Sequence, residues 1–160
     1  MKNKFYISII LFILFLICCS LQTKKIKYNI PEELNNKINF YLEQFNKFPD
    51  ENIFLINIAN ILNEYKYFDE SLKYLNRAES NNPKKDDLIK ILELKINIFE
   101  TKKRYSDAIT AAISLLNINN VLENHLLLSK LYFENKDYLK SIEILKNALE
   151  TNPDNIEILN

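Results

Sequence analysis

The stretch SLKYLNRAESNNP, residues 71–83, has a counterpart 70 residues further along the chain, SIEILKNALETNP at residues 141–153. Each stretch has a small residue first, then a leucine four residues later, an alanine three residues after the leucine, and a proline five residues after the alanine. A third stretch, from Ala108 to Asn120, has Ala112, Leu115 and Asn120 at the corresponding offsets, so leucine replaces the alanine and asparagine the proline. Three copies of one pattern indicate an array of repeated structural units.

Each unit is predicted to contain two helices. In the first unit an apolar stripe with helical spacing precedes the stretch at 71–83, and Phe68 lies at the turn between the two helices. Proline ends the second helix because it has no N–H and clashes with the preceding turn. The stripe consists of Leu55, Ile58, Ala59 and Leu62, and the last unit repeats the whole pattern with His125, Leu128, Ser129, Tyr132, Tyr138, Ser141, Leu145, Ala148 and Pro153.

This order of large, small and proline positions resembles the tetratricopeptide repeat, whose pattern is a large residue, Leu-Gly, Tyr, then Ala, Phe, Ala and Pro. The resemblance covers about two-thirds of the chain, residues 52–155. It implies an all-α fold, an α-solenoid of about three helix-turn-helix repeats at 52–85, 88–121 and 122–155. The small pairs Ala59 with Ser71 and Ser129 with Ser141 are expected to let paired helices approach closely.

The middle unit fits the pattern less well. Aligning its first helix with that of the last unit requires one extra residue among Lys102, Lys103 and Arg104, and this register puts Lys95 where a small residue is expected. The chain also contains no glycine, so we expect asparagine to take the left-handed positions at helix ends. The candidates are Asn81, Asn82, Asn119, Asn120, Asn135 and Asn152.

Single segments flank the array. An apolar stripe after Pro31 predicts one helix within residues 30–50, which we interpret as half a repeat that packs on the first full unit. Residues 156–160 are the opening of a further first helix. This tail either folds back over the end of the array or leaves an adhesive C-terminal face that docks onto something.

The N-terminus has the pattern of a bacterial lipoprotein signal peptide at residues 1–18. A basic start precedes a largely apolar run of thirteen residues, from Phe5 to Ile17, which is too short for a comfortable membrane span. The run ends in LICCS, which resembles a lipobox with Cys19 as the lipidated residue. Cys18 is the second candidate, and an ordinary secretory signal or an uncleaved anchor is the alternative. Residues 19–29 are predicted to be a flexible tether.

Composition argues against several other functions. The chain has 21 basic and 21 acidic residues, and loss of the signal peptide with Lys2 and Lys4 leaves a small negative balance, so nucleic acid is not an expected partner. His125 is the single histidine and is expected to pack between helices. Without glycine there is no phosphate-binding loop, and no cysteine follows Cys19. We therefore predict no catalytic residues, no cofactor and no metal.

The resemblance implies a partner site in the concave groove lined by the first helices. It suggests a largely apolar groove that suits an amphipathic helix or an extended apolar segment of a partner protein. The predicted groove residues are Ile53, Ile56 and Asn60 from the first unit, Ile89, Leu92, Ile96 and Phe99 from the second, and Leu126, Lys130 and Phe133 from the third.

The leading functional hypothesis is a lipid-anchored protein of the bacterial cell envelope that acts as a protein-interaction scaffold or assembly factor. The alternative is a lipoprotein displayed on the cell surface that binds host or environmental molecules. Accessibility to protease on intact cells would separate the two.

Overall fold

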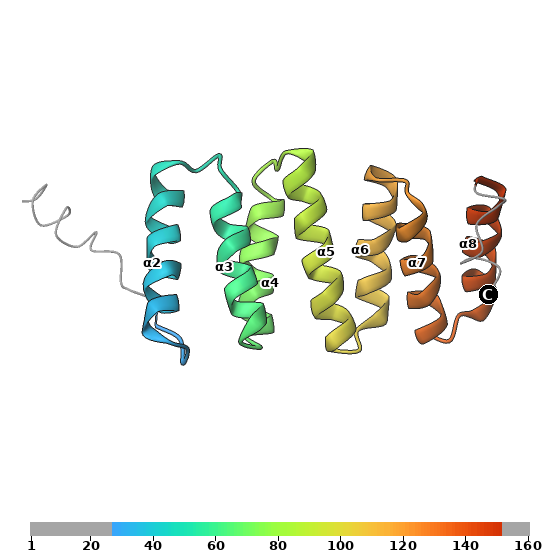
Figure 1. Cartoon of the computed structure of the whole chain (residues 1–160), viewed down its shortest axis with the longest axis horizontal. Helices are drawn as coiled ribbons and strands as arrows, with labels where there is room; N and C mark the ends of the chain where they lie inside the picture. Colours follow the sequence, from blue (N-terminus) through green and yellow to red (C-terminus); the bar gives the residue numbers. More distant parts are fainter. Residues whose placement is uncertain (1–26, 152–160) are drawn as a thin grey trace, which may run out of the picture.

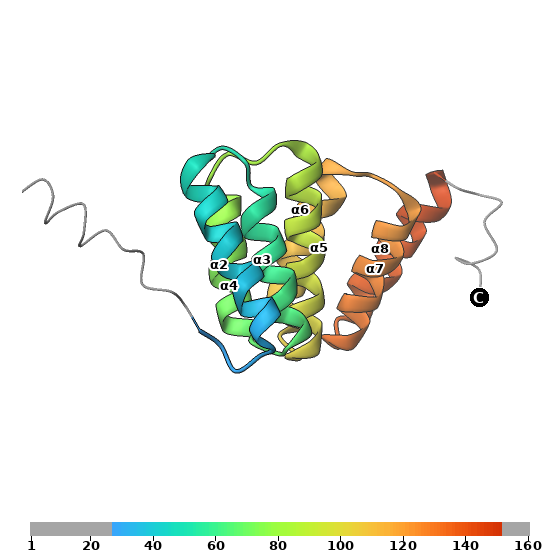
Figure 2. The same cartoon turned by 60° about the vertical axis from the view of Figure 1, so that its left-hand side comes forward.

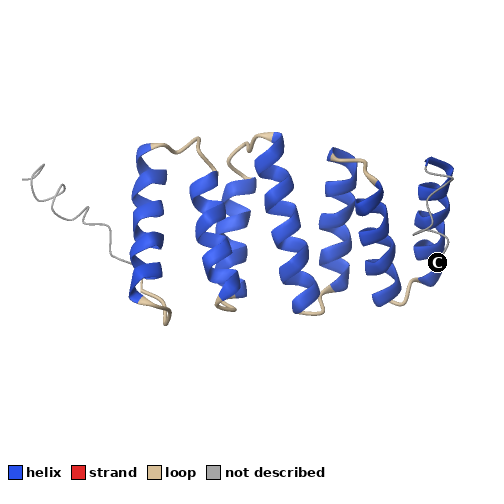
Figure 3. Ribbon diagram, viewed as in Figure 1, coloured by secondary structure: helices blue, strands red, loops and turns tan. Residues whose placement is uncertain are grey.

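The computed structural model describes residues 27–151 as an array of helices, with no strand in this range. The helices lie side by side in chain order along one axis (Figures 1 and 3). This confirms the predicted all-α solenoid. The helices are α2 (Glu32–Lys47), α3 (Ile53–Glu64), α4 (Phe68–Glu79), α5 (Lys85–Thr101), α6 (Tyr105–Ile118), α7 (Leu122–Glu134) and α8 (Tyr138–Thr151).

Successive helices form three hairpins, α3 with α4, α5 with α6 and α7 with α8, which we call units 1, 2 and 3. The single helix α2 packs on α3, and α5 packs on both α3 and α4. Figure 2 shows α7 and α8 as a pair at the C-terminal end of the array. Each helix therefore meets only its near neighbours, which is typical of repeat proteins.

The three turns inside the units have one geometry. Each is three residues long, and its last residue donates a backbone N–H bond of 2.8–2.9 Å to a carbonyl five residues earlier, that of Leu62, Phe99 or Tyr132. The middle residue of each turn has a left-handed backbone, with φ of 62° at Lys66, 55° at Lys103 and 65° at Lys136.

The expectation that asparagine takes the left-handed positions is correct only at Asn82, whose φ is 50°. Asn119 and Asn135 have negative φ, and Asn152 lies outside the described residues. Lysine occupies the turn positions because its side chain is exposed there and needs no room inside the fold. The left-handed conformation still costs a residue with a Cβ atom roughly 1 kcal/mol relative to glycine.

Because the three turns have the same length, the alignment of α5 with α3 and α7 differs from the one predicted from the sequence. Because Lys102–Arg104 has the same length as the other turns, no extra residue lies there, and Ile96 rather than Lys95 aligns with Ala59 and Ser129. The additional length is at the front of α5, which has 17 residues, compared with 12 in α3 and 13 in α7. Lys95 instead reaches back to α4, where its Nζ lies 2.6 Å from Glu79 Oε2.

Small residues hold the helices of units 1 and 3 together. The Ser71 hydroxyl donates a 2.8 Å hydrogen bond to the Ala59 carbonyl, and the Ser129 and Ser141 hydroxyls lie 2.9 Å apart. In unit 2 the buried Ile96 packs against the cluster that contains Ala108, so a large residue on α5 is matched by a small one on α6. Close approach is therefore achieved in all three units, by two different combinations of side chains.

The core runs continuously along the array. One cluster joins α2, α3, α4 and α5, and a second joins α5, α6 and α7, with Ile144 of α8 packed against it. Phe99 packs against both clusters, so α5 connects the two halves of the array. Ala78 and Ala148, the alanines of the repeated stretch, are both fully buried.

The chain entering α2 is fixed to the array. The buried Asn35 accepts a hydrogen bond from the Tyr28 N–H at 2.8 Å and donates to the carbonyls of Tyr28 and Ile30 at 3.0 and 3.1 Å. The Asn29 N–H donates to the Tyr67 hydroxyl at 3.1 Å. Tyr28 and Asn29, the last two residues of the predicted tether, are thus hydrogen-bonded to the array through Asn35 and Tyr67.

Several sequence predictions fall outside the described residues. These are the signal peptide with Cys18 and Cys19, the tether up to residue 26, the end of the third predicted repeat at 152–155 with Pro153, and the tail at 156–160. Within residues 27–151 no helix has the length and apolar character needed to span a membrane.

Candidate functional site

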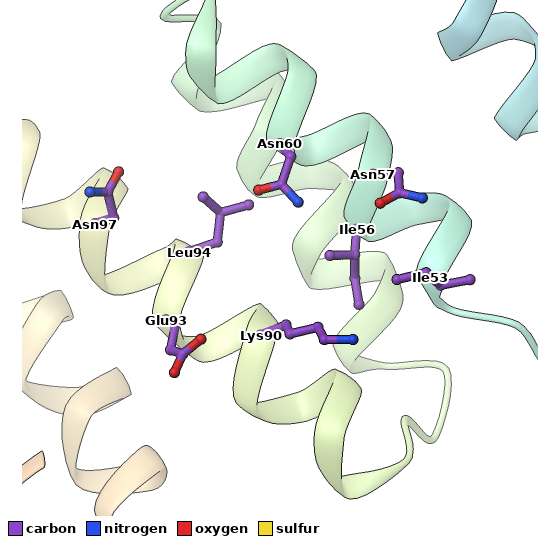
Figure 4. Close-up of a pocket in the computed structure, with 8 residues that line it drawn as sticks. All are labelled: Ile53, Ile56, Asn57, Asn60, Lys90, Glu93, Leu94 and Asn97. Atoms are coloured by element: carbon purple, nitrogen blue, oxygen red, sulfur yellow. The ribbon is translucent and has the colours of Figure 1, made fainter.

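A groove of about 530 Å³ lies between α3 and α5, the first helices of units 1 and 2. Figure 4 shows the side chains that line it, which come from both α3 and α5. Its floor is apolar and its edges carry amides and charges. The lining residues are Ile53, Ile56, Asn57 and Asn60 from α3, and Lys90, Glu93, Leu94 and Asn97 from α5.

The helical period explains why these side chains lie on one face of each helix. Ile53, Ile56, Asn57 and Asn60 are three or four residues apart, so they share one face of α3. The opposite side of α3 packs on α4 through residues such as Ala59. α5 repeats this arrangement 37 residues later, in the register that the turns define, with Lys90, Glu93, Leu94 and Asn97.

Two amides of the groove are unengaged. Among residues 27–151, the side-chain amides of Asn57 and Asn60 have no hydrogen-bond partner, and Glu93 has no ion pair. An asparagine amide carries two N–H donors and a carbonyl acceptor, so it can bind both polar groups of a peptide backbone. Lys90 has only a long ion pair, 3.8 Å, to Asp87 one turn earlier.

A series of polar bridges follows the groove from unit to unit. The Asn63 amide donates to Asn97 Oδ1 at 3.3 Å, and Lys130 Nζ lies 2.8 Å from Glu100 Oε1. The two bridges join equivalent positions of adjacent units, since Asn63 and Glu100 each immediately follow the residue whose carbonyl closes the turn. The hydrogen bond to Glu100 raises the pKa of Lys130 above its ordinary value.

The structure brings part of the predicted groove together. Ile53, Ile56 and Asn60 line it, although Ile56 is almost fully buried and contributes mainly to the floor. In unit 3, Lys130 and Phe133 are exposed and Leu126 is half-buried on α7.

The groove residues predicted on α5 need correction. Leu92 and Ile96 are buried in the cluster shared with α6, so they are core residues. Phe99 is half-buried beneath the Arg104 guanidinium, whose carbon lies 4.8 Å from the ring centroid, and Ile89 is half-buried outside the groove. The error came from the extra residue assumed in the turn at 102–104, which shifted the α5 alignment by one position.

Sequence reasoning also missed the polar character of the groove. It omitted Asn57 as well as Lys90, Glu93, Leu94 and Asn97. Counting back a constant distance from each three-residue turn would have found the α5 positions. The groove between units 1 and 2 therefore carries more polar side chains than the sequence led us to expect.

His125 was expected to pack between helices, and the structure gives it a polar contact as well. Its Nε2 lies 2.8 Å from Asn120 Oδ1, in the connection before α7, while its Nδ1 is buried without a partner. Within residues 27–151 no group of histidine, cysteine or carboxylate side chains is placed to hold a metal ion.

Comparison with known proteins gives similarity at the level of the fold. No known protein family matches this sequence, and no curated protein does. The solved structure of YrrB, described as a TPR protein with an unusual peptide-binding site, is similar with a TM-score of 0.57 at 16% identity, over 74% of this chain and 60% of YrrB. This chain thus matches less than two thirds of YrrB.

The structure of MamA is similar with a TM-score of 0.58 at 13% identity, over 83% of this chain and 80% of MamA. Both identities are low, so the likeness concerns the backbone arrangement alone. Residues 27–151 of this chain adopt the fold of tetratricopeptide repeat proteins.

Proposed function

We propose that this protein is an interaction scaffold that binds an extended segment of a partner protein in the groove between α3 and α5. The observation that carries the proposal is the pair of unengaged amides, Asn57 and Asn60, above an apolar floor. The fold supports the general role, because tetratricopeptide arrays are interaction modules. YrrB, which shares this fold, is described as having a peptide-binding site.

The dimensions and chemistry of the groove favour an extended chain. The stretch of α3 from Ile53 to Asn60 is about 10 Å long, which equals about three residues of extended peptide. The amides can bind backbone N–H and C=O groups whatever the partner's sequence. Ile53 and Leu94 offer an apolar surface for alternate side chains, and Lys90 and Glu93 can select charged ones.

A direct test uses peptides selected from a random library for binding to the full chain. The variant Asn57→Ala with Asn60→Ala should bind them at least about tenfold more weakly, because two backbone-binding amides are removed. Asn76→Ala is the matched control, since Asn76 is an exposed asparagine on α4 outside the groove. Equal affinities of the wild type and the double variant, with the same melting temperature, would exclude this groove as the peptide site.

We also propose that the array is held at a bacterial membrane by lipid on Cys19 and works in the cell envelope. The lipobox-like LICCS motif and the short apolar run before it support this placement. Display on the cell surface remains the alternative. Digestion by protease added to intact cells would favour surface display, and protection until the outer layer is opened would favour an internal assembly role.

The proposed function involves no catalysis and no cofactor. Among the described residues the groove contains a single carboxylate, Glu93, and no histidine or cysteine. Nucleophilic catalysis typically pairs a nucleophile with a base within hydrogen-bond reach, and the groove side chains do not form such a pair. Binding is the activity for which this groove has suitable groups.

A further inference from the structure

The helices that form the groove carry acidic side chains without ion-pair partners. Among residues 27–151, six charged side chains of the first helices α3, α5 and α7 take part in no ion pair, and five of the six are acidic. The second helices α4, α6 and α8 also have six such side chains in this range, but three are acidic and three are basic. The uncompensated charge of the first helices is therefore negative. Their unpaired residues are Glu64, Asp86, Glu93, Glu123 and Glu134, with Lys85 as the basic one.

Glu93 is the acidic side chain that lines the groove itself. It is exposed on α5 and has no ion pair within the described part of the chain. Glu64 adds negative charge near one end of the groove, because it lies four residues after Asn60 on the same face of α3. A charged group that enters the groove from a partner therefore meets Glu93 as a carboxylate whose hydrogen-bonding capacity is unused.

Lys90, the basic side chain of the groove, already has a partner of opposite charge. Its Nζ lies 3.8 Å from Asp87 Oδ1, one turn earlier on α5, and the Asp87 side chain is only 15% exposed. Figure 4 shows Lys90 and Glu93 pointing in different directions from α5, so Lys90 does not cover the Glu93 carboxylate. An anionic group brought to Lys90 would be repelled by Asp87 and Glu93, whereas a cation brought to Glu93 meets an unpaired carboxylate.

We propose that the partner segment bound in this groove carries a lysine or arginine whose side chain pairs with Glu93. This inference rests on the proposed function, because it specifies the chemistry of the segment that the groove binds. Charge complementarity sets the preference, since an ionised carboxylate accepts hydrogen bonds from an ammonium or a guanidinium group. The groove also shields the pair from part of the surrounding water, which strengthens the attraction between opposite charges.

The apolar floor adds a second requirement for the partner. Leu94 follows Glu93 in α5 and lines the same groove, opposite Ile53 and Ile56 of α3. In an extended segment, side chains two positions apart point the same way and are separated by about 7 Å. The expected partner motif is a basic residue with an apolar residue one or two positions away.

Selection from a random peptide library tests the charge preference. The full chain is the bait, and the variant Glu93→Gln is used in a parallel selection. Peptides bound by the wild type should be enriched several-fold in lysine and arginine relative to the library, and Glu93→Gln should lose this enrichment. Glu143→Gln, which changes an exposed glutamate on α8, is the matched control and should retain it.

Charge exchange with one selected peptide tests the pairing with Glu93. Replacing the basic residue of the peptide by glutamate should weaken its binding to the wild type about tenfold, because a charge-assisted contact is lost and like charges are opposed. The variant Glu93→Lys should reverse the preference and bind the glutamate peptide more tightly. Glu93 is exposed, so the helix content measured by circular dichroism should be the same in these variants.

The proposal is overturned if the selected peptides show no basic enrichment, or if Glu93→Gln leaves the enrichment unchanged. Enrichment of acidic residues that is lost with Lys90→Gln would also overturn it, because Lys90 would then select the partner. In each case, binding that still depends on Asn57 and Asn60 would leave the proposed function intact. Failure to select any peptide whose binding depends on these two amides would overturn both.

Discussion

The Ser71 hydroxyl donates a hydrogen bond of 2.8 Å to the main-chain carbonyl of Ala59, and both residues are fully buried. This contact fixes α4 against α3 at a separation that only small side chains permit. The equivalent residues of unit 3, Ser129 and Ser141, are also hydrogen-bonded to each other. A hydrogen-bonded pair of small residues therefore holds the two helices together in both unit 1 and unit 3.

Ser71→Ala should lower the free energy of unfolding by about 1 kcal/mol, because one buried hydrogen bond is lost without steric change. Ser71→Leu should cost more, ~2 kcal/mol or above, because the added atoms force the helices apart. Urea unfolding measures both. Ser80→Ala is the control, since Ser80 is exposed at the end of α4 and its loss should change stability by less than about 0.5 kcal/mol.

Lys66→Gly should stabilise the protein by roughly 0.5–1 kcal/mol. Lys66 has φ of 62°, and glycine adopts this conformation without the steric cost that a Cβ atom brings. Lys73→Gly is the matched control, because Lys73 lies inside α4, where glycine should destabilise by about 1 kcal/mol. A loss of stability with both variants would show that the turn at Lys66 does not have the left-handed conformation.

Phe99→Ser should lower stability by ~2 kcal/mol or more, whereas Phe133→Ser should change it by less than about 0.5 kcal/mol. Phe99 packs against both core clusters, while Phe133 is more than half exposed. The two residues were aligned with each other from the sequence, but in the structure Phe99 aligns with Tyr132. Thermal unfolding of the two variants distinguishes the two alignments. If Phe99 and Phe133 were equivalent, as the sequence alignment has it, both variants would lose similar amounts of stability.

Stability should fall at alkaline pH partly through Tyr28. Burial, and secondarily a hydrogen bond with Tyr74, raises the pKa of the Tyr28 hydroxyl well above its ordinary value. In the unfolded chain this hydroxyl ionises at about pH 10, whereas in the folded protein it stays protonated to higher pH. Ionisation therefore favours the unfolded chain, so the free energy of unfolding is unaffected below about pH 10 and falls as the pH rises further. Tyr28→Phe cannot ionise and should lose less stability between about pH 9 and 11 than the wild type.

Urea midpoints at the two pH values measure this difference. Tyr65→Phe, on the exposed end of the α3–α4 hairpin, is the control and should follow the wild type. An identical pH dependence of Tyr28→Phe and the wild type would show that Tyr28 is not protected from ionisation by the fold.

Cys19→Ala should move the protein from the detergent phase to the aqueous phase, because the proposed lipid attachment site is removed. Labelled fatty acid incorporated by growing cells measures the attachment directly. Continued labelling of Cys19→Ala would shift the assignment to Cys18, and Cys18→Ala then provides the deciding variant. A wild-type protein without label would exclude lipidation at both cysteines.

The repeated small residues allowed the helix pairs to be predicted from the sequence. Ser71, Ala78, Ser141 and Ala148 are all buried, because a small side chain at a fixed offset marks where two helices meet. The candidate groove could be predicted in unit 1, where Ile53 and Asn60 line it. It was missed in unit 2, because apolar residues cover so much of α5 that matching them gave the wrong register.

The sequence by itself determined the properties that depend on local spacing and residue size: helices of about three to five turns, their pairing into units and the position of the small residues. Only the tertiary structure decided which side chains of α5 face the groove, that Lys95 pairs with Glu79, and that Ile56 is buried while Phe133 is exposed. The physical reason is that burial depends on which helices lie on each side of a residue. Two residues with the same helical spacing therefore have different environments at the middle and at the end of an array.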